Sequence, residues 1–530
     1  MPQSPVSELA APLEQAIAAV GGDGAPVRLE RPADASHGDY ASAVALGLAR
    51  TLRAAPRDIA GRIGERLESP WIASVEVAGP GFINLRVAPS FHRHVVQRVL
   101  EEGERYGAGA ASNPQRVQVE YVSGNPTGPV TAATARNAAY GDSLARLFEF
   151  AGHTVQREYY FNDAGRQMEL FGESLWARAH GEPVPEGGYE GAYLEEVVDR
   201  LRLPPDASPD DWRIRGGEVM TEDIKHTLTR FRACFDRWFL ERSLYEDGSL
   251  ESAVERVKAG GHTFEKDGAL WLRTTDFGDD KDRVVVRSNG SPTYIAGDLA
   301  YIVSKLERVD VAVYVLGSDH HGYIGRLKAG ARALGYDPDR IDVQIYQLVK
   351  IVEGGQAVKV SKRRGNVLML DELLDMIGVD AARYALVQRS HDQAIELDLD
   401  RWVEQNDENP VYYCQYAHAR IAAILRNAGP GAEASVADPG WTPEPAEAEL
   451  VKALADFPDL VAEAAERRGP HRVAAYAQDT AKAFHQFYRQ CRVLGSAPAV
   501  EQSRLALCRA TMQVIRTALG LIGVEAPESM

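Results

Sequence analysis

Cysteine is scarce in this sequence, and long apolar runs are missing. The 530 residues include 4 cysteines, which do not fall at the spacings that bind zinc or form a disulfide framework. They are Cys234, Cys414, Cys491 and Cys508. Residues 1–20 lack the basic stretch and apolar core of a secretory signal, and no run is long enough to cross a bilayer. We therefore expect a cytoplasmic protein with buried, reduced thiols and no membrane partner.

Positive charge is also in short supply. The chain has 59 Lys and Arg residues against 76 Asp and Glu residues, which gives a net charge of −17. An acidic chain does not by itself indicate a nucleic-acid binder, although a local basic face would be enough for one. The length and the hydrophobic content of 45% are typical of a globular protein with three or four domains.

Residues 1–105 have the pattern of a small α+β domain. Helical periodicity occurs three times in this range and strand alternation twice. The expected helices and strands lie at residues 7–19, 40–52, 58–67, 72–77 and 82–87.

Residues 106–400 have the pattern of an α/β domain with a doubly wound parallel sheet. A strand expected at 117–122 leads through a Pro/Gly turn into a helix at 134–150 and a strand at 153–161. Residues of about 168–280 are helical and charged, and we interpret them as an insertion into the sheet. Later strands are expected at 283–287, 309–316 and 342–352.

Residues 401–530 are predicted to be entirely helical. The apolar positions repeat with helical spacing in four long segments. These segments are 411–427, 446–467, 473–493 and 502–520.

Two segments about 230 residues apart carry the clearest chemical signals. The first, VEYVSGNPTGPVTAAT at 119–134, places a Pro/Gly turn after a strand, where open α/β sheets bind ligands. The second, KVSKR at 359–363, has two lysines that could neutralise the charge on a phosphate leaving group. Either segment alone would be a weak signal, because lysine-rich loops are usually only solvated.

Ten segments in the same order together resemble bacterial-type arginyl-tRNA synthetases, which are class I enzymes. They include HGDYASAVALGLA, NPTGP, REYYFNDAGRQ, LGSDHHGYIGRLKA and NPVYYCQYAHAR. The resemblance implies an N-terminal domain for the tRNA elbow at 1–105, a Rossmann-like catalytic domain at 106–400 and an anticodon-binding domain at 401–530. It also implies L-arginine, ATP with Mg²⁺ and tRNA(Arg) as partners, a monomer, and no metal ion or cofactor held by the protein itself.

One of the two ATP signatures of this family is altered. Thr131, Ala133 and Thr134 stand where the HIGH box of the family has His, Gly and His. Each threonine can still donate a hydrogen bond but cannot become cationic, and Ala133 adds a methyl group where adenine lies close to the backbone. Losing one transition-state donor typically costs about 10²–10³ in rate.

The resemblance assigns roles to further residues. Lys359, Ser361 and Lys362 match the KMSKS loop that closes over the ATP phosphates. The arginine substrate is assigned to Tyr294 and Asp298, which share one face of an expected helix, and to Glu120, Asn125 and, as a weaker candidate, Asp319. The tRNA is assigned to Phe82, Asn84, Tyr416 and His418.

Three interpretations remain open at this stage. The chain could ligate arginine to tRNA(Arg) through arginyl-adenylate. It could be a divergent paralogue with reduced or redirected arginine activation. It could also be a protein that binds tRNA or arginine without chemistry, although the KVSKR segment argues against that.

Overall fold

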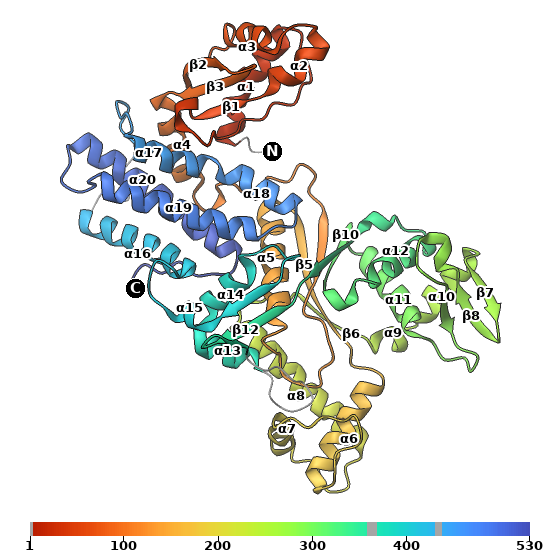
Figure 1. Cartoon of the computed structure of the whole chain (residues 1–530). Coiled ribbons are helices and arrows are strands. Elements are labelled where there is room, and N and C mark those ends of the chain that lie inside the picture. The colour runs from red at the N-terminus through yellow and green to blue at the C-terminus, as the bar shows by residue number, and fades with distance from the viewer. Residues whose placement is uncertain (1–3, 358–367, 430–436) are drawn as a thin grey trace.

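A five-stranded parallel sheet forms the centre of the molecule. The computed structural model describes residues 4–357, 368–429 and 437–530 (Figure 1). The strand order is β11-β10-β4-β5-β6. The first strand, β4, is therefore in the middle, and later strands are added first on one side of it (β5, β6) and then on the other (β10, β11). The strands are β4 (Arg116–Glu120), β5 (Thr154–Phe161), β6 (Arg237–Leu240), β10 (Val311–Gly317) and β11 (Ile341–Tyr346). Ligands bind beside such a reversal of strand order, at the carboxyl ends of the strands.

Helix α5 (Ala135–Ala151) makes the first crossover and lies against the sheet. It is buried along most of its length because it contacts β4 and β5 of the sheet and also helices from later in the chain. A Cβ added to Gly141 would lie 2.4 Å from the Tyr121 ring. The prediction of strand, helix and strand at this point is confirmed.

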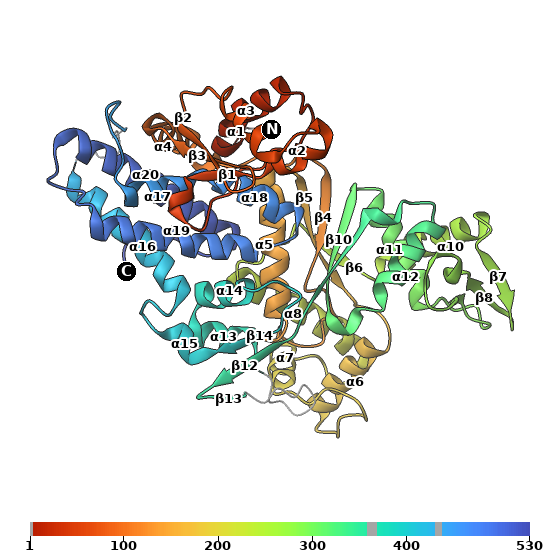
Figure 2. The same ribbon diagram turned by 45° about the horizontal axis from the view of Figure 1, so that its top comes forward.

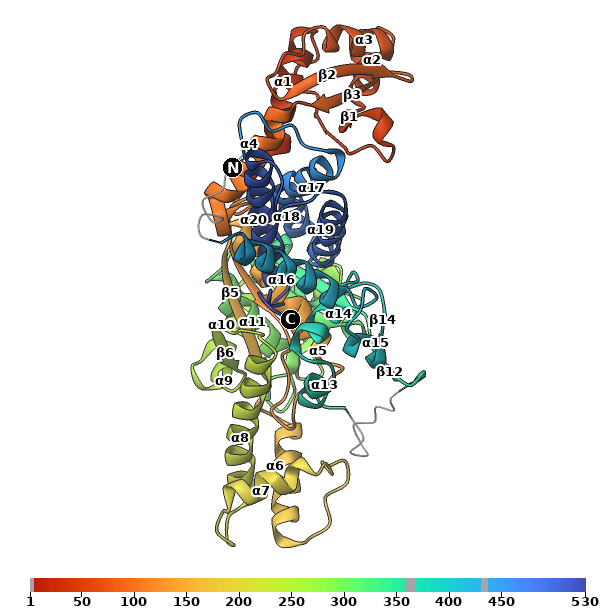
Figure 3. The same ribbon diagram turned by 90° about the vertical axis from the view of Figure 1, so that its left-hand side faces the viewer.

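Two excursions leave the sheet, and neither matches the single insertion expected at 168–280. Helices α6 (Arg166–His180), α7 (Tyr193–Leu201) and α8 (Pro209–Arg230) lie between β5 and β6 and bury a core of their own (Figure 3). Strand β6 then returns to the central sheet, which divides the predicted insertion in two.

The second excursion lies between β6 and β10 (Figure 2). It contains α9 (Ser243–Glu246), α10 (Ser249–Ala259), β7 (Thr263–Lys266), β8 (Ala269–Leu272), β9 (Arg283–Val286) and α11 (Tyr294–Leu306). Strands β7, β8 and β9 pair antiparallel in a separate sheet, so the prediction that 283–287 belongs to the parallel sheet is wrong.

The single strand predicted at 342–352, which follows β10 and α12 (Tyr323–Ala333), is two strands in the structure. Strand β11 ends at Tyr346, and β12 (Val349–Glu353) joins a small sheet with β13 (Gln356–Ala357) and β14 (Ile395–Asp398). Three short helices pack beside this sheet, namely α13 (Leu370–Ile377), α14 (Val379–Val387) and α15 (Leu399–Val403).

The C-terminal part is helical, as predicted. It consists of α16 (Pro410–Ala428), α17 (Pro445–Ala455), α18 (Phe457–Glu466), α19 (His471–Gln490) and α20 (Pro498–Leu521). The helix expected over 446–467 divides at Asp456, because Pro458 in the first turn of α18 cannot donate a backbone hydrogen bond to the preceding turn.

The N-terminal part is a three-stranded antiparallel sheet with helices, and it packs on the C-terminal helices at the end of the molecule opposite α6–α8 (Figures 1 and 3). Its elements are α1 (Pro5–Ala19), β1 (Tyr40–Ser42), α2 (Val44–Leu52), α3 (Pro56–Gly64), β2 (Ile72–Ala78), β3 (Phe82–Val87) and α4 (Pro89–Glu102). The helix expected from Tyr40 begins only at Val44, because the preceding residues pair with β3. Helix α4 was not predicted.

Ion pairs from Asp39 and from Arg31, which contacts both Glu449 and Asp456, fix the N-terminal part to α17 and its surroundings, together with hydrogen bonds. Lys452 donates to Asp39 at 2.8 Å, and Arg31 reaches Asp456 at 3.4 Å. The Tyr106 hydroxyl donates to the Leu454 carbonyl oxygen at 2.9 Å.

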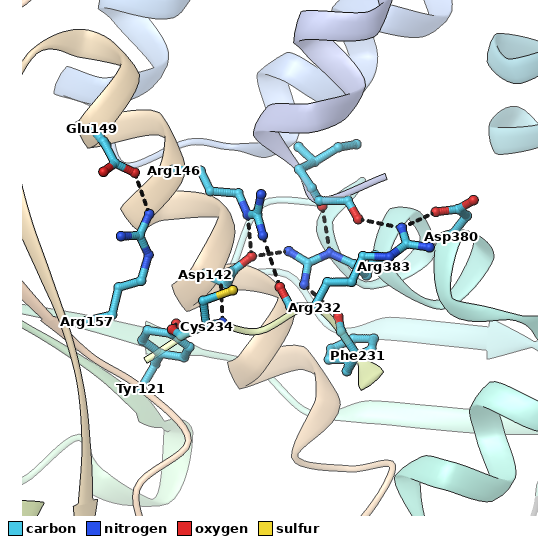
Figure 4. Close-up of polar contacts among 12 residues, drawn as sticks. Tyr121, Asp142, Arg146, Glu149, Arg157, Phe231, Arg232, Cys234, Asp380 and Arg383 are labelled. Atoms are coloured by element: carbon cyan, nitrogen blue, oxygen red, sulfur yellow. Dashed lines mark hydrogen bonds and ion pairs between the residues drawn. The ribbon is translucent and has the colours of Figure 1, made fainter. Parts of the chain in front are cut away.

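A buried arginine joins the catalytic and C-terminal parts (Figure 4). Arg383 of α14 is fully buried and donates to Asp142 of α5 at 2.5 Å. The same guanidinium donates to the carbonyl oxygens of Phe231, just after α8, and Ile522, just after α20, each at 2.9 Å. Gly523 has a φ of +71°, and a Cβ there would lie 2.1 Å from Arg383 Nε. The end of the chain is thereby tied to α5.

Candidate active site

A cavity of about 220 Å³ opens at the carboxyl ends of β4 and β5. The backbone of Gly124, just beyond β4, pairs with Phe161 at the end of β5. The lining residues are Asn125, Asn162, Ala164, Arg166, Gln167, Tyr294 and Tyr323. The cavity therefore lies beside the strand reversal that the topology marks as a ligand site.

Tyr294 and Asp298 lie one turn apart at the start of α11, as the i,i+4 spacing predicted. Tyr294 is 71% exposed at the cavity, whereas Asp298 lies deeper. Its Oδ2 atom is buried and has no hydrogen-bond partner among the described residues. Burial raises the pKa of Asp298 to about 6, an effect that Arg326 opposes and Glu120 reinforces. A buried carboxyl oxygen without a donor suits a ligand that brings its own donors.

A second buried carboxyl, Glu241, was not foreseen from the sequence. It follows β6 and is 5% exposed. It lies close to α11, because a Cβ added to Gly297 would be 4.0 Å from Glu241 Oε1. With the Asn162 side-chain amide oriented so that its nitrogen faces acceptors, this nitrogen donates to Glu241 Oε2 at 2.5 Å. Burial, followed by the charge of Asp163, raises the pKa of Glu241 to about 7. Glu241 follows a strand of the parallel sheet just as Glu120 ends one, so recognition of β6 would have pointed to it.

Glu120 lies beneath the cavity rather than in its lining. Its carboxylate forms a buried ion pair with Lys305 of α11. The ammonium group lies 4.3 Å from the Tyr301 ring centre and 3.5 Å from that of Tyr314. Glu120 therefore fastens α11 to β4.

The other two residues assigned to arginine differ in position. Asn125 lines the cavity, and its amide donates to the Asn162 carbonyl oxygen at 2.9 Å. Asp319 lies past the end of β10 outside the lining, with its side chain 82% exposed and 3.6 Å from His320.

The altered box leads directly into α5. The Thr131 and Thr134 hydroxyls are hydrogen-bonded to each other at 3.0 Å, and Thr134 precedes the first residue of α5. Ala133 is exposed. Thr131 and Thr134 thus lie at a helix N-terminus, where backbone dipoles favour anions such as phosphate.

The second signature, with Lys359, Ser361 and Lys362, lies outside the residues that the structure describes. The backbone at Leu368 and Leu370, which follows it, pairs with the altered box. Ala132 N donates to Leu368 O at 3.0 Å, and Leu370 N donates to Val130 O at 2.8 Å.

The four residues assigned to tRNA fall into two groups. Phe82 is 39% exposed at the start of β3, and Tyr416 is half-buried, stacked on Tyr412 and His485. Asn84 is only 5% exposed in the middle strand. His418 has no exposed surface and bonds the Pro527 carbonyl oxygen at 2.8 Å, so we no longer expect it to contact tRNA directly.

Two absences apply to the part of the chain that the structure describes. No helix in it is both long and apolar enough to pass through a membrane. No group of three His, Cys, Asp or Glu side chains in it could enclose a metal ion.

Comparisons with known families cover nearly the whole chain. Residues 95–181 and 212–422 match the catalytic domain of class I (R) tRNA synthetases. Residues 7–87 match the arginyl tRNA synthetase N terminal domain, and residues 414–530 match the DALR anticodon binding domain.

Solved structures agree with these matches. A Campylobacter jejuni protein assigned as an arginyl-tRNA synthetase is 30% identical over 84% of this chain and 100% of its own, with a TM-score of 0.78. The Thermus thermophilus arginyl-tRNA synthetase is 22% identical, with both chains covered completely and a TM-score of 0.79. A Mycobacterium tuberculosis methionyl-tRNA synthetase with methionyl-adenylate is 14% identical over 78% of this chain and 92% of its own, with a TM-score of 0.55.

The fold and the site define a class I aminoacyl-tRNA synthetase. The three matched domains are specific enough to go further. The chain belongs to the arginyl-tRNA synthetase family.

Proposed function

We propose that this chain ligates L-arginine to tRNA(Arg) in two steps. The arginine carboxylate attacks the α-phosphorus of ATP, which forms arginyl-adenylate and releases pyrophosphate. A hydroxyl group of the terminal tRNA ribose then attacks the carbonyl carbon of the adenylate, and AMP leaves. Mg²⁺ would arrive with the ATP phosphates and neutralise part of their charge.

The observation that carries this proposal is a pair of carboxyls near the cavity, Asp298 with its buried Oδ2 atom and the buried Glu241. Arginine presents a planar cation with five N–H donors, and such a group is best bound by carboxylate and hydroxyl acceptors. Asp298 offers an oxygen without a donor, and Glu241 lies close by. Both carboxyls are costly to ionise in the free protein, so an incoming guanidinium would recover that cost.

The ATP end of the site would lie at the start of α5. Thr131 and Thr134 would donate to phosphate oxygens, with the helix dipole behind them. Lys359 and Lys362, with Ser361, would cover the pyrophosphate. Ala133 is the residue least suited to the task, because its methyl group is exposed where the family leaves space for adenine.

Among tRNA contacts, we propose Phe82 for the tRNA elbow and Tyr416 for the anticodon arm. Each offers an aromatic face at least partly open to solvent. Aromatic side chains of this kind stack on unpaired bases. We propose that the chain acts as a monomer, as is usual in the family.

The test is arginine-dependent ATP–pyrophosphate exchange with tRNA(Arg) present. It compares this chain with the triple variant Thr131→His, Ala133→Gly and Thr134→His. Exchange by the unmodified chain would support a working synthetase. Exchange only by the variant would support a paralogue that has lost ATP activation, and exchange by neither would support a binding protein.

A further inference from the structure

Helix α8 contacts the segment that holds the altered box in place. Arg230, the last residue of α8, donates from Nη1 to Asp371 Oδ1 at 2.8 Å and to the Asp371 carbonyl oxygen at 3.3 Å. Its Nη2 atom pairs with Asp375, and the buried Thr227 hydroxyl donates to the other oxygen of Asp371. One turn of α8 is therefore attached to the first turns of α13.

The first turn of α13 is in turn attached to the box. Leu370, its first residue, is fully buried and donates to Val130 O, while Ala132 donates to Leu368 O. Thr131 and Met369 form an antiparallel bridge between these two hydrogen bonds. A shift of this turn would move the backbone of Thr131 with it, because the two hydrogen bonds, at 3.0 and 2.8 Å, join the two segments on either side of Thr131.

The same helical unit reaches two other parts of the site. The Tyr193 hydroxyl, at the start of α7, donates to Thr127 O at 2.7 Å, in the loop before the box. Ala164, Arg166 and Gln167, at and just before the start of α6, line the cavity. Helices α6, α7 and α8 share one apolar core, so these contacts belong to one body.

We propose that Arg230 is a positioning residue for ATP use, acting through Asp371 and the Leu368–Leu370 backbone on Thr131. Arg230 does not touch a substrate. It joins Asp371 and Asp375 of α13 to α8 and so fixes the position of the backbone bridge between Met369 and Thr131 of the box. The expected change in KM for ATP rests on the proposed function, whereas the expected effect on the backbone of the box does not.

Arg230→Gln removes the charge and the bridge between Asp371 and Asp375 while keeping a good helix former. Helix α13 stays folded in this variant because Leu370, Leu373, Leu374 and Ile377 remain buried. Arg215→Gln is the matched control, since Arg215 lies on the same helix and pairs with Glu218, at 3.5 Å, with both side chains largely exposed. Arg230→Lys should be intermediate, because an ammonium group can hold one carboxylate but not bridge two.

Hydrogen exchange at the amides of Ala132 and Leu370 in the unliganded protein tests the structural claim. We expect exchange about fivefold faster in Arg230→Gln, the factor that corresponds to losing about 1 kcal/mol of partly exposed ion pairing. Arg215→Gln should leave both amides unchanged. Equal exchange in the two variants, whether raised or not, would overturn the proposal.

Kinetics test the consequence. In ATP–pyrophosphate exchange, we expect KM for ATP to rise about fivefold in Arg230→Gln while KM for arginine stays constant. A parallel rise in both KM values would show a general disturbance and would overturn the assignment to ATP. If the unmodified chain catalyses no exchange, the proposed function fails, and the amide measurement still decides the role of Arg230.

Discussion

Arginine binding should release protons, and its affinity should therefore fall steeply as the pH is lowered. The pKa of Asp298 is about 6 and that of Glu241 about 7, both raised mainly by burial. Both groups must be ionised to pair with a guanidinium. Below these values the free protein holds protons that the substrate has to displace, so acid disfavours binding.

The size of the effect follows from these two values. At pH 6 about half of the Asp298 side chains and about one tenth of the Glu241 side chains are ionised, so about 1 in 20 molecules has both charges. At pH 8 nearly all molecules do. The dissociation constant for arginine should be about 20-fold higher at pH 6 than at pH 8.

Calorimetric titration with arginine measures both parts of this prediction. Repeating the titration in buffers of different ionisation enthalpy gives the number of protons released, which should be about 1.4 at pH 6 and close to zero at pH 8. The matched variants separate the two groups. The ratio of dissociation constants should fall to about twofold in Glu241→Gln and to no more than about tenfold in Asp298→Asn, because the Asp298 charge itself helps to raise the pKa of Glu241.

Glu251→Gln is the control, because Glu251 is exposed on α10 and lies outside the cavity lining. This variant should keep the ratio of about 20 between the dissociation constants at pH 6 and pH 8, because both titrating groups are still present. An affinity that is constant between pH 6 and pH 8 would refute the reasoning. So would an unchanged ratio in Glu241→Gln, since the titrating groups would then lie elsewhere.

Three substitutions test the buried polar groups by thermal unfolding. Lys305→Met leaves the Glu120 carboxylate buried without its partner and should cost about 3–5 kcal/mol; a double variant with Glu120→Gln should recover part of the lost stability. Arg383→Met should also lower the stability, although Asp142 keeps its ion pair with Arg146, because the carboxylate loses its fully buried partner. Gly523→Ala should also lower the unfolding temperature, since its Cβ would overlap Arg383 at a positive φ. Unfolding temperatures equal to that of the unmodified chain would contradict each expectation.

The sequence predicted the crossover from β4 to β5 and the helical C-terminal part because the periodicity there is long and uninterrupted. It failed where the chain changes sheets. The run from Ile341 to Glu353 is rich in β-branched residues and breaks its alternation around Gln347, which pairs with His391 and accepts a hydrogen bond from Arg136. Those partners are distant in the sequence, so no local pattern could reveal the change.

The site shows the same division between local and distant information. Tyr294 and Asp298 could be placed on one face because their spacing alone determines it. Glu241 could not, because it follows a strand of four residues that gives almost no periodic signal. The ion pair of Glu120 with Lys305 depends on the packing of α11 against β4, which the spacing of neither residue encodes.

The attachment of the N-terminal part to α17 has a consequence for biosynthesis. Asp39 and Lys452 are separated by 413 positions, and Tyr106 and Leu454 by 348. At about 5–20 residues per second, the ribosome needs roughly 20–80 seconds between making Asp39 and making Lys452. During that interval the surface that later receives α17 is open to water and to other nascent chains. The acidic Asp39 at its edge, together with the overall negative charge, would help to keep that surface from premature association.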